Sequence, residues 1–247
     1  MSRISLENVS VSFPIFSPHT RSIRTAVLSR LGGKLESYNG TVFVEALQNI
    51  SLDLDDGDRL GLVGHNGAGK TTFLRLVSGV YPPQSGEVFV NGKASSFTDI
   101  TLGMDPEATG WENITFRCIF LGLTFREAKA LAPSIAEFSE LEEYLNLPVR
   151  TYSTGMFLRL AFAISTAVQP DIVIMDEMIG AGDQRFLEKA QERINELLQK
   201  ASVLVLASHN EQILRQFCNR ILWLEKGRMK MIGPVDEVLS AYSDSCR

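Results

Sequence analysis

A glycine-rich segment followed by a lysine and two threonines carries the strongest chemical signal in the sequence. It reads GHNGAGKT over residues 64 to 71, and Thr72 comes next. Its glycines let the backbone curl so that successive amide hydrogens converge on phosphate oxygens. Lys70 can then reach the β and γ phosphates, the Thr71 hydroxyl can bind Mg²⁺, and Thr72 extends the cradle toward the α phosphate. The spacing predicts a P-loop that binds ATP and Mg²⁺ through Gly64, His65, Asn66, Gly67, Ala68, Gly69, Lys70, Thr71 and Thr72.

Two acidic residues after an apolar run could supply the carboxylates that a P-loop requires. The run IVIM, residues 172 to 175, is followed by Asp176 and Glu177. We expect Asp176 to hold Mg²⁺, usually through water. We expect Glu177 to polarise the attacking water as general base, an effect worth about 10²–10⁴ in rate. Acidic residues at a strand end are common, so this interpretation depends on the P-loop in the same chain.

A histidine after another apolar run is the third catalytic candidate. His209 comes shortly after VLVLA, residues 203 to 207, where a side chain at the carboxyl edge of a parallel sheet faces the ligand crevice. We expect it to contact the γ phosphate, which makes Glu177, His209 and Lys70 the predicted catalytic residues. A lone histidine is usually structural, but its order after the two other motifs favours the catalytic role. His19 and His65 are interpreted as loop residues, with His65 exposing only its backbone to chemistry.

The apolar runs that must position these groups predict an α/β fold with a mostly parallel sheet. Residues 4 to 13 and 42 to 54 alternate apolar and polar side chains, as half-buried strands do. Four shorter runs are continuously apolar, as parallel strands covered on both faces are. They lie at residues 59 to 63, 172 to 175, 203 to 207 and 220 to 224. The P-loop stands between the first of these runs and a helix, which is the arrangement that phosphate binding needs.

A helical region separates the P-loop from the acidic pair. Residues 106 to 148 place apolar and aromatic side chains at helical spacing, and we expect most of them to be core. A nearly all-apolar helix follows, with Ser153 placed as its N-cap. The segment GPVDEVLSAY predicts one last helix. Any exposed aromatic side chains of the helical region would form a docking surface.

Composition excludes several classes of protein. The chain has 247 residues, of which 45% are hydrophobic, so it can bury a large core. A net charge of −5 argues against nucleic acid as a partner, since binding to phosphate backbones needs clustered Lys and Arg. No stretch approaches the roughly 18 apolar residues that span a bilayer. The cysteines Cys118, Cys218 and Cys246 form no CxxC pair, so we expect a soluble chain in a reducing cytosol.

A short motif before the acidic pair resembles that of a known family. YSTGM, residues 152 to 156, is similar to the LSGGQ signature of ABC-transporter ATPases. Ser153 and Gly155 agree with that signature, while the other three residues depart from it. Gly182 and Asp183 resemble the D-loop of the same family. The family's fold is a P-loop NTPase (RecA-like) core with a mostly parallel sheet, an antiparallel β subdomain and an ABC-type helical subdomain.

The resemblance implies one nucleotide-binding domain over residues 1–247. It comprises β-subdomain strands at 1–58 with an insertion at 14–41, a RecA-like core at 59–104 and 170–247, and a helical signature subdomain at 105–169. It also implies a head-to-tail homodimer with two ATP molecules between opposing subunits. A helix N-terminus capped by Ser153, with Gly155 permitting close approach, is a phosphate site of its own. Ser153, Gly155 and Asp183 are therefore predicted to serve the partner's ATP.

Longer stretches resemble one branch of the family. YSTGMFLRLAFA, MDEMIGAGD and ILWLEKGRMKMIGPVDEVLSAY are similar to the ATPase subunits that export bacterial O antigens, capsules and teichoic acids. The resemblance implies a short form without a C-terminal carbohydrate-binding domain, a membrane permease as partner and a lipid-linked polysaccharide as transported substrate. It places the chain at the cytoplasmic face of the bacterial inner membrane. Two alternatives stay open: an ABC ATPase for another solute or lipid, and a soluble ABC ATPase without a transport role.

Two departures from the family pattern, and the insertion, leave roles open. Residues 85 to 168 contain no glutamine, although the family usually has one there, and Asp105 or Glu107 is the candidate replacement. The adenine-stacking aromatic is predicted to be Phe13, with Phe43 as its rival and core packing as the alternative for both. The insertion resembles one that faces the membrane subunit. It has a positive local balance that suits lipid head groups, although it could be a solvated loop.

Overall fold

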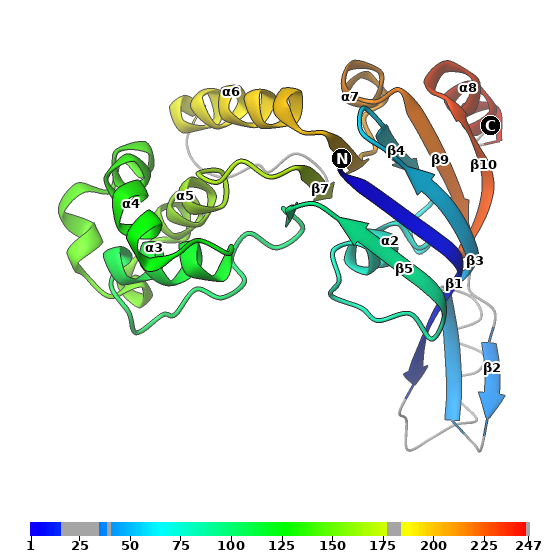
Figure 1. The fold of residues 1–247 in the computed structure, drawn as a ribbon, viewed down its shortest axis with the longest axis horizontal. Coiled ribbons are helices and arrows are strands. Elements are labelled where there is room, and N and C mark those ends of the chain that lie inside the picture. Colours follow the sequence, from blue (N-terminus) through cyan, green and yellow to red (C-terminus); the bar gives the residue numbers. More distant parts are fainter. Residues whose placement is uncertain (16–34, 39–40, 177–183, 246–247) are drawn as a thin grey trace. The chain divides into compact units, whose positions relative to one another are not determined.

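The computed structural model describes residues 1–15, 35–38, 41–176 and 184–245. The insertion at 14–41 therefore lies mostly outside the described residues, as do Glu177, Gly182 and Asp183. The chain divides into two compact units (Figure 1). Unit 1 comprises Met1–Ala94, Asp171–Glu177 and Ser202–Arg247, and unit 2 comprises Ser95–Pro170 and Met178–Ala201. The short strand β6 (Ala94–Ser96) spans the boundary between them.

Unit 1 contains an antiparallel sheet whose central strand keeps its apolar face through a bulge. The strand order is β2 (Leu35–Tyr38), β3 (Thr41–Leu54), β1 (Arg3–Ile15) and β5 (Ser85–Asn91). In β1 the buried positions change from Ile4 and Leu6 to Val9 and Val11. The pairing of β1 with β3 shifts between Leu6 and Val9, next to Asn8 with a φ of 49°. This extra residue lets both halves of the strand bury their apolar side chains on the same face.

The second sheet of unit 1 confirms the predicted α/β fold. In the order β10, β9, β4, β8 and β7, all neighbours are parallel except the pair β10 and β9. The bounds are β10 (Arg228–Pro234), β9 (Arg220–Glu225), β4 (Arg59–Val63), β8 (Val203–Ala207) and β7 (Ile172–Asp176). The strand interiors are buried almost throughout, because a parallel sheet is covered on both faces.

Among its described residues, unit 1 has the helices α2 (Lys70–Val77), α7 (Glu211–Phe217) and α8 (Val235–Ser245). One hydrophobic core joins residues of both sheets to the buried face of α2, and it includes Leu62, Phe73, Leu74 and Val205. Because that core fixes β4 and α2 together, it also fixes the loop that connects them. The described residues contain no helix long and apolar enough to cross a membrane.

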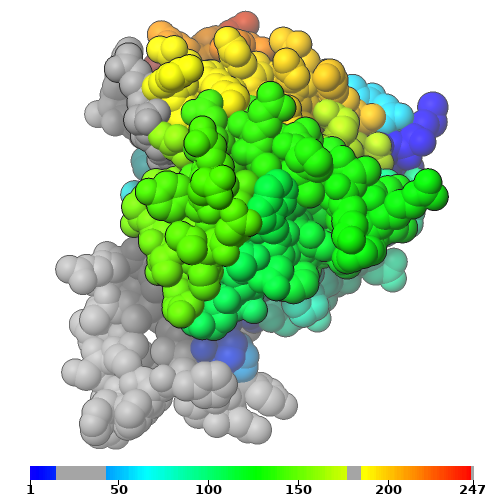
Figure 2. All heavy atoms as spheres, turned by 90° about the vertical axis from the view of Figure 1, so that its left-hand side faces the viewer, coloured from blue at the N-terminus to red at the C-terminus, as the bar shows by residue number. Residues whose placement is uncertain are grey.

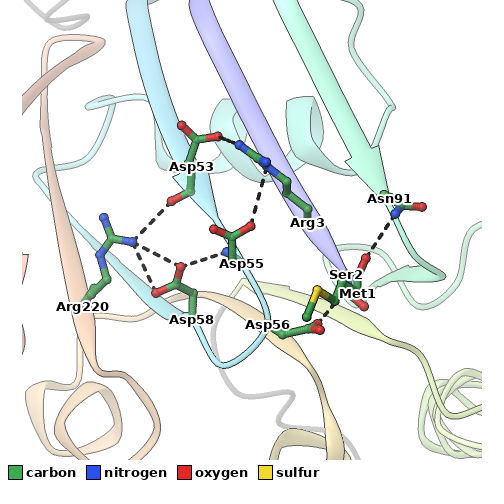
Figure 3. A network of polar contacts seen from close by, with 9 residues as sticks. All are labelled: Met1, Ser2, Arg3, Asp53, Asp55, Asp56, Asp58, Asn91 and Arg220. Atoms are coloured by element: carbon green, nitrogen blue, oxygen red, sulfur yellow. Dashed lines mark hydrogen bonds and ion pairs between the residues drawn. The ribbon is translucent and has the colours of Figure 1, made fainter.

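A polar network ties the start of β1 to the turn before β4 (Figure 3). The Ser2 backbone N–H donates to Asp56 Oδ1 at 2.8 Å, and Arg3 pairs with Asp53 at 2.8 Å. The Arg3 hydrogen bond is also the main reason that the pKa of the Asp53 carboxyl lies below its usual value. Exposed ion pairs of this kind contribute little free energy each, so the network mainly sets the strand register.

Unit 2 is helical and has its own core. Its elements are α3 (Gly110–Phe120), α4 (Phe125–Ser139), the 3-10 helices η1 (Glu142–Asn146) and η2 (Val149–Thr151), α5 (Thr154–Ser165) and α6 (Gln184–Lys200). Thr109 and Thr124 begin α3 and α4 with capping boxes, because each is followed three residues later by a glutamate. Ile114, Ile135, Leu145 and Leu160 are among the residues of the core.

The expectation that most aromatic side chains of the helical region are core is wrong for α3. Phe116, Ile119 and Phe120 are 50%, 43% and 65% exposed, and Trp111 is 38% exposed. Ile114 and Cys118 form the buried stripe of this helix instead. These α3 side chains belong to the surface of unit 2, part of which faces the viewer in green in Figure 2. Helical spacing identifies a helix but does not tell which of two apolar stripes its neighbours cover.

Candidate functional site

The glycine-rich loop leads from the end of β4 into α2, and its glycines have the backbone that phosphate binding needs. Gly64, Gly67 and Gly69 have φ angles of 150°, 78° and 106°. A Cβ atom would lie 2.3 Å from the Leu224 carbonyl oxygen at Gly64, and 2.7 Å from the Ala46 carbonyl oxygen at Gly69. At Gly67 a Cβ atom would meet nothing within 4 Å. Two glycines therefore permit tight packing of the loop, and the third lies on its open side.

Lys70, the first residue of α2, lies across this loop. Its Nζ donates to the carbonyl oxygens of Gly64 at 2.6 Å and His65 at 3.3 Å. The Ala68 backbone N–H also donates to the His65 oxygen, at 3.0 Å. Asn66 is exposed, Ala68 is buried and Thr72 is half-buried. The ammonium group is thus placed at the mouth of the loop, beside the amides that would bind phosphate.

The two predicted metal ligands meet, although they are 105 residues apart in the chain. The Thr71 hydroxyl donates to Asp176 Oδ2 at 2.9 Å. Thr71 lies in the first turn of α2, and Asp176 is the last residue of β7. An alcohol oxygen beside a carboxylate suits Mg²⁺, which binds few protein ligands and completes its octahedron with water and phosphate oxygens. Among the described residues no group of three or more His, Cys, Asp or Glu side chains could hold a metal.

His209 extends from the same edge of the sheet. It follows β8, which lies between β4 and β7, so its position is at the carboxyl ends of the strands that carry the loop and Asp176. Its side chain is exposed. The next residue, Asn210, caps α7 by accepting the Gln212 N–H at 2.9 Å, which fixes the turn that carries His209. Glu177, the predicted general base, lies outside the described residues.

The signature residues belong to unit 2. Ser153 is the N-cap of α5, and its Oγ accepts the Met156 N–H at 3.2 Å. Gly155 is in the first turn, where the nearest atom to a Cβ would be Ser153 Oγ at 4.0 Å. Among the described residues, no neighbour comes close enough to require a glycine at this position. Asp183 lies outside the described residues.

The aromatic candidates for adenine stacking pair with sheet and loop neighbours. Phe13 is half-buried on β1 and packs edge-on against Tyr81, with ring centroids 5.0 Å apart. Phe43 is half-buried on the adjacent strand β3, opposite Pro14. Phe13 also packs against the core of unit 1, so part of its surface is used for folding.

Both acidic candidates for the missing glutamine have partners within unit 2. Asp105 Oδ1 accepts the Glu107 backbone N–H at 2.9 Å, and Glu107 pairs with Arg150 at 3.3 Å. The residue that organises this loop is Asn113, which the sequence analysis did not single out. Asn113 is fully buried; its Nδ2 donates to the carbonyl oxygens of Asp105, Ala108 and Thr109, and its Oδ1 accepts the Asp105 N–H. The sequence does contain a signal for this role, because Asn113 is a polar residue at a position in the apolar stripe of a helix.

Replacing Asn113 by alanine is expected to lower the free energy of unfolding by about 1–3 kcal/mol, because the buried carbonyls and the Asp105 amide lose their partner. Thermal unfolding of the full chain measures the loss. Asn146→Ala is the matched control, since Asn146 is exposed and its hydrogen bonds are to Glu143. Equal melting temperatures for Asn113→Ala and the unaltered chain would contradict this assignment.

Comparison with known proteins gives a consistent result. The model of the family described as ABC transporter matches residues 47–180. The O-antigen export system ATP-binding protein RfbE of Yersinia enterocolitica is 43% identical, over 92% of this chain and 96% of that protein. RfbB of Myxococcus xanthus, named likewise, is 36% identical, over 99% of this chain and 56% of that protein. A dimeric ATP-binding cassette bound to ADP and Pi has a similar fold, with a TM-score of 0.66, 21% identity and coverage of 94% and 98%.

Proposed function

The chain belongs to the ATP-binding proteins of the ABC transporter family, and from this premise we propose that it is the ATP-hydrolysing motor subunit of a polysaccharide exporter. Its substrate would be a lipid-linked surface polysaccharide of the O-antigen type, moved across the bacterial inner membrane. The observation that carries this proposal is 43% identity with an O-antigen export ATP-binding protein over 96% of that protein. The meeting of Thr71 and Asp176 supports the ATPase part independently.

The described residues suit a defined division of labour at the ATP phosphates. Lys70 would leave the Gly64 and His65 carbonyls and bind the β and γ phosphates. Thr71 and Asp176 would hold Mg²⁺, which when bound neutralises charge on the phosphate oxygens. Glu177 would accept a proton from the attacking water, and His209 would orient the γ phosphate. Water must reach only the γ phosphate, so these groups would act together only when the site is closed.

The capped start of α5 supports a site shared between two copies of this chain. Ser153 and Gly155 would bind the γ phosphate of the ATP held by the partner's P-loop, and Asp183 would lie beside that interface. The support is that the described residues leave open space around Gly155, although glycine is a poor helix former. Glycine lowers the stability of the helix at position 155, and no packing among the described residues requires it. Such a position suits close approach by another molecule.

An aspartate at position 155 is therefore expected to separate folding from catalysis. Negative charge in the first turn favours the helix by about 0.3–1 kcal/mol, so Gly155→Asp should keep or slightly raise the melting temperature. The same charge would oppose the partner's γ phosphate, and ATPase activity should fall at least ~10-fold. Gly155→Ala is the control, because it adds only a methyl group in open space and should retain more activity. ATPase activity of Gly155→Asp equal to that of Gly155→Ala would contradict the shared site.

The exposed apolar side chains of α3 suit a permease partner. Phe116, Ile119 and Phe120 form an apolar patch on a helix end, and such patches on soluble units mark interaction sites. Binding there would hold the chain at the cytoplasmic face of the inner membrane and would transmit dimer closure to the transport path. The patch is a second reason, besides the relatives' names, to favour transport over a soluble ABC ATPase.

Co-purification with a candidate permease tests the function. The full chain is expressed with a polytopic membrane protein encoded beside it, and ATPase activity is measured with and without lipid-linked glycan. We expect a complex whose activity responds to the glycan. A complex that responds only to another solute or lipid would favour that alternative within transport. A chain that hydrolyses ATP but binds no permease, and whose gene lies among DNA-repair genes, would overturn the exporter proposal.

A further inference from the structure

A row of side chains in contact with one another connects the last helix to the P-loop. Lys230 Nζ lies 4.0 Å from the centroid of the Trp223 ring, which packs edge-on against Tyr242 at 5.3 Å. The Tyr242 ring in turn lies 5.9 Å from the His65 ring, at an angle of 52°. The two ring separations are within the range in which aromatic rings attract each other, and the lysine lies at cation–π distance. The row therefore extends from β10 through β9 and α8 to the second residue of the glycine loop.

On the loop, the row ends at His65, whose carbonyl oxygen accepts a hydrogen bond from Lys70. The His65 carbonyl oxygen accepts from Lys70 Nζ at 3.3 Å and from the Ala68 N–H at 3.0 Å. The His65 side chain is exposed, so the core of unit 1 does not hold it. Contact with Tyr242 is thus a restraint on the position of residue 65 that acts from outside the loop. By holding residue 65, the tyrosine also holds the carbonyl that places Lys70.

Away from the loop, Trp223 and Tyr242 of this row lie on elements that pack closely in unit 1. Trp223 is only 4% exposed on β9, and its neighbour Leu224 contributes the carbonyl that packs against Gly64. Helix α8 packs on β9, β10 and α7 (Figure 1). Val238 and Leu239 of α8 are fully buried, Asp236 pairs with Arg215 of α7, and Ser243 donates to Glu211 at 2.9 Å. Tyr242 is therefore presented to the loop from a helix that is anchored on both sides.

We propose that Tyr242 is a positioning residue for the P-loop: its ring holds His65, and through the His65 backbone it presets the loop amides for the ATP phosphates. This rests on the ATP-binding function proposed above and adds to it a role for α8. A mobile loop must be ordered when the phosphates bind, and that ordering weakens binding. A loop held beforehand binds ATP more tightly, while the chemical step, which depends on Glu177 and His209, is unaffected.

Kinetics of the full chain test this assignment. Replacing Tyr242 by alanine is expected to raise KM for MgATP about three- to tenfold, in line with the loss of an aromatic contact, with kcat within about twofold. Tyr242→Phe keeps the ring and should retain the original KM. Tyr242→Leu keeps apolar volume on α8 without the ring, so it should raise KM like alanine even where the alanine variant folds poorly.

A matched variant on the same helix separates the ring from the helix. Asp236→Ala removes the pairing with Arg215 but leaves every ring in place, so it should leave KM unchanged. An Asp236→Ala variant with the same rise in KM would overturn the assignment, since α8 packing in general would then be responsible. An unchanged KM in both Tyr242→Ala and Tyr242→Leu would overturn it directly.

Tryptophan fluorescence gives a second measurement. If Tyr242 only stabilised the fold, the response of this fluorescence to ATP would not depend on Tyr242. The chain has two tryptophans, so Trp223 is the sole tryptophan after Trp111→Phe. Adding ATP should change Trp223 emission in this background, because phosphate bound at the loop adds negative charge beside His65 and Tyr242 connects that residue to Trp223, and the response should be lost after Tyr242→Ala. An equal change in Trp223 emission with and without Tyr242→Ala would overturn the proposal. If the unaltered chain binds no ATP, the proposed function itself fails, and this result is distinct from ATP binding that does not depend on Tyr242.

Discussion

The variant Lys70→Ala is expected to lose ATP binding and, with it, all export activity. Lys70 is the one side-chain cation that the sequence pattern aims at the β and γ phosphates, and the structure places its Nζ 2.6 Å from the Gly64 carbonyl at the mouth of the loop. Its removal leaves phosphate charge without a positive partner, which should reduce ATPase activity at least ~10²-fold. Equilibrium binding of ATP and ATPase turnover of the purified chain measure the loss.

Two comparisons make this result interpretable. Alanine is a good helix former, so the change at the first residue of α2 should leave the far-ultraviolet circular dichroism unaltered. Lys93→Ala is the matched control, because Lys93 is an exposed lysine of the same unit in the turn after β5. In a strain that lacks the gene, Lys93→Ala should restore the surface glycan and Lys70→Ala should not. Restoration by Lys70→Ala would refute the motor function.

The variant Glu177→Gln is expected to bind ATP but to turn it over at least ~10²-fold more slowly, because an amide cannot accept the proton of the attacking water. Slow hydrolysis should trap two subunits around two ATP molecules, since closure requires ATP and opening requires its cleavage. Size-exclusion chromatography with ATP should show a dimer for this variant and a smaller share of dimer for the unaltered chain. Single-turnover kinetics measure the chemical step.

Glu188→Gln is the control for this amide substitution. Glu188 is exposed on α6, a few residues further along the chain, and its replacement should leave turnover unchanged. Near-normal turnover of Glu177→Gln would show that another group activates the water. A dimer that is trapped without ATP would show that the glutamine changes the interface rather than the chemistry.

Much of the core was predictable because it depends on local sequence patterns. The runs that become β7, β8 and β9 are continuously apolar, and a strand buried on both faces needs this. The capping pattern of Ser153 also predicted where α5 begins. Strands β5 and β10 were missed, because their short runs are only partly buried and mix apolar with polar residues.

The outward face of α3 was also not predictable from spacing. Ile114 and Phe116 are both apolar residues of the same helix, yet one is buried and the other is half exposed. The difference arises because the core of unit 2 covers one stripe of the helix and leaves the other open. Only the neighbours of a helix decide this, and they come from distant parts of the chain.

The P-loop shows the same division between sequence and tertiary structure. The residue pattern at 64 to 71 is enough to predict a phosphate-binding loop, since glycine spacing sets the backbone angles that aim amides at phosphate. The contacts of Thr71 with Asp176 and of Tyr242 with His65 appear only in the folded chain. Backbone angles are local, because they depend on the residue types at consecutive positions. These two contacts join residues that are 105 and 177 positions apart in the chain. They depend on how strands and helices pack, and no short sequence pattern specifies that packing.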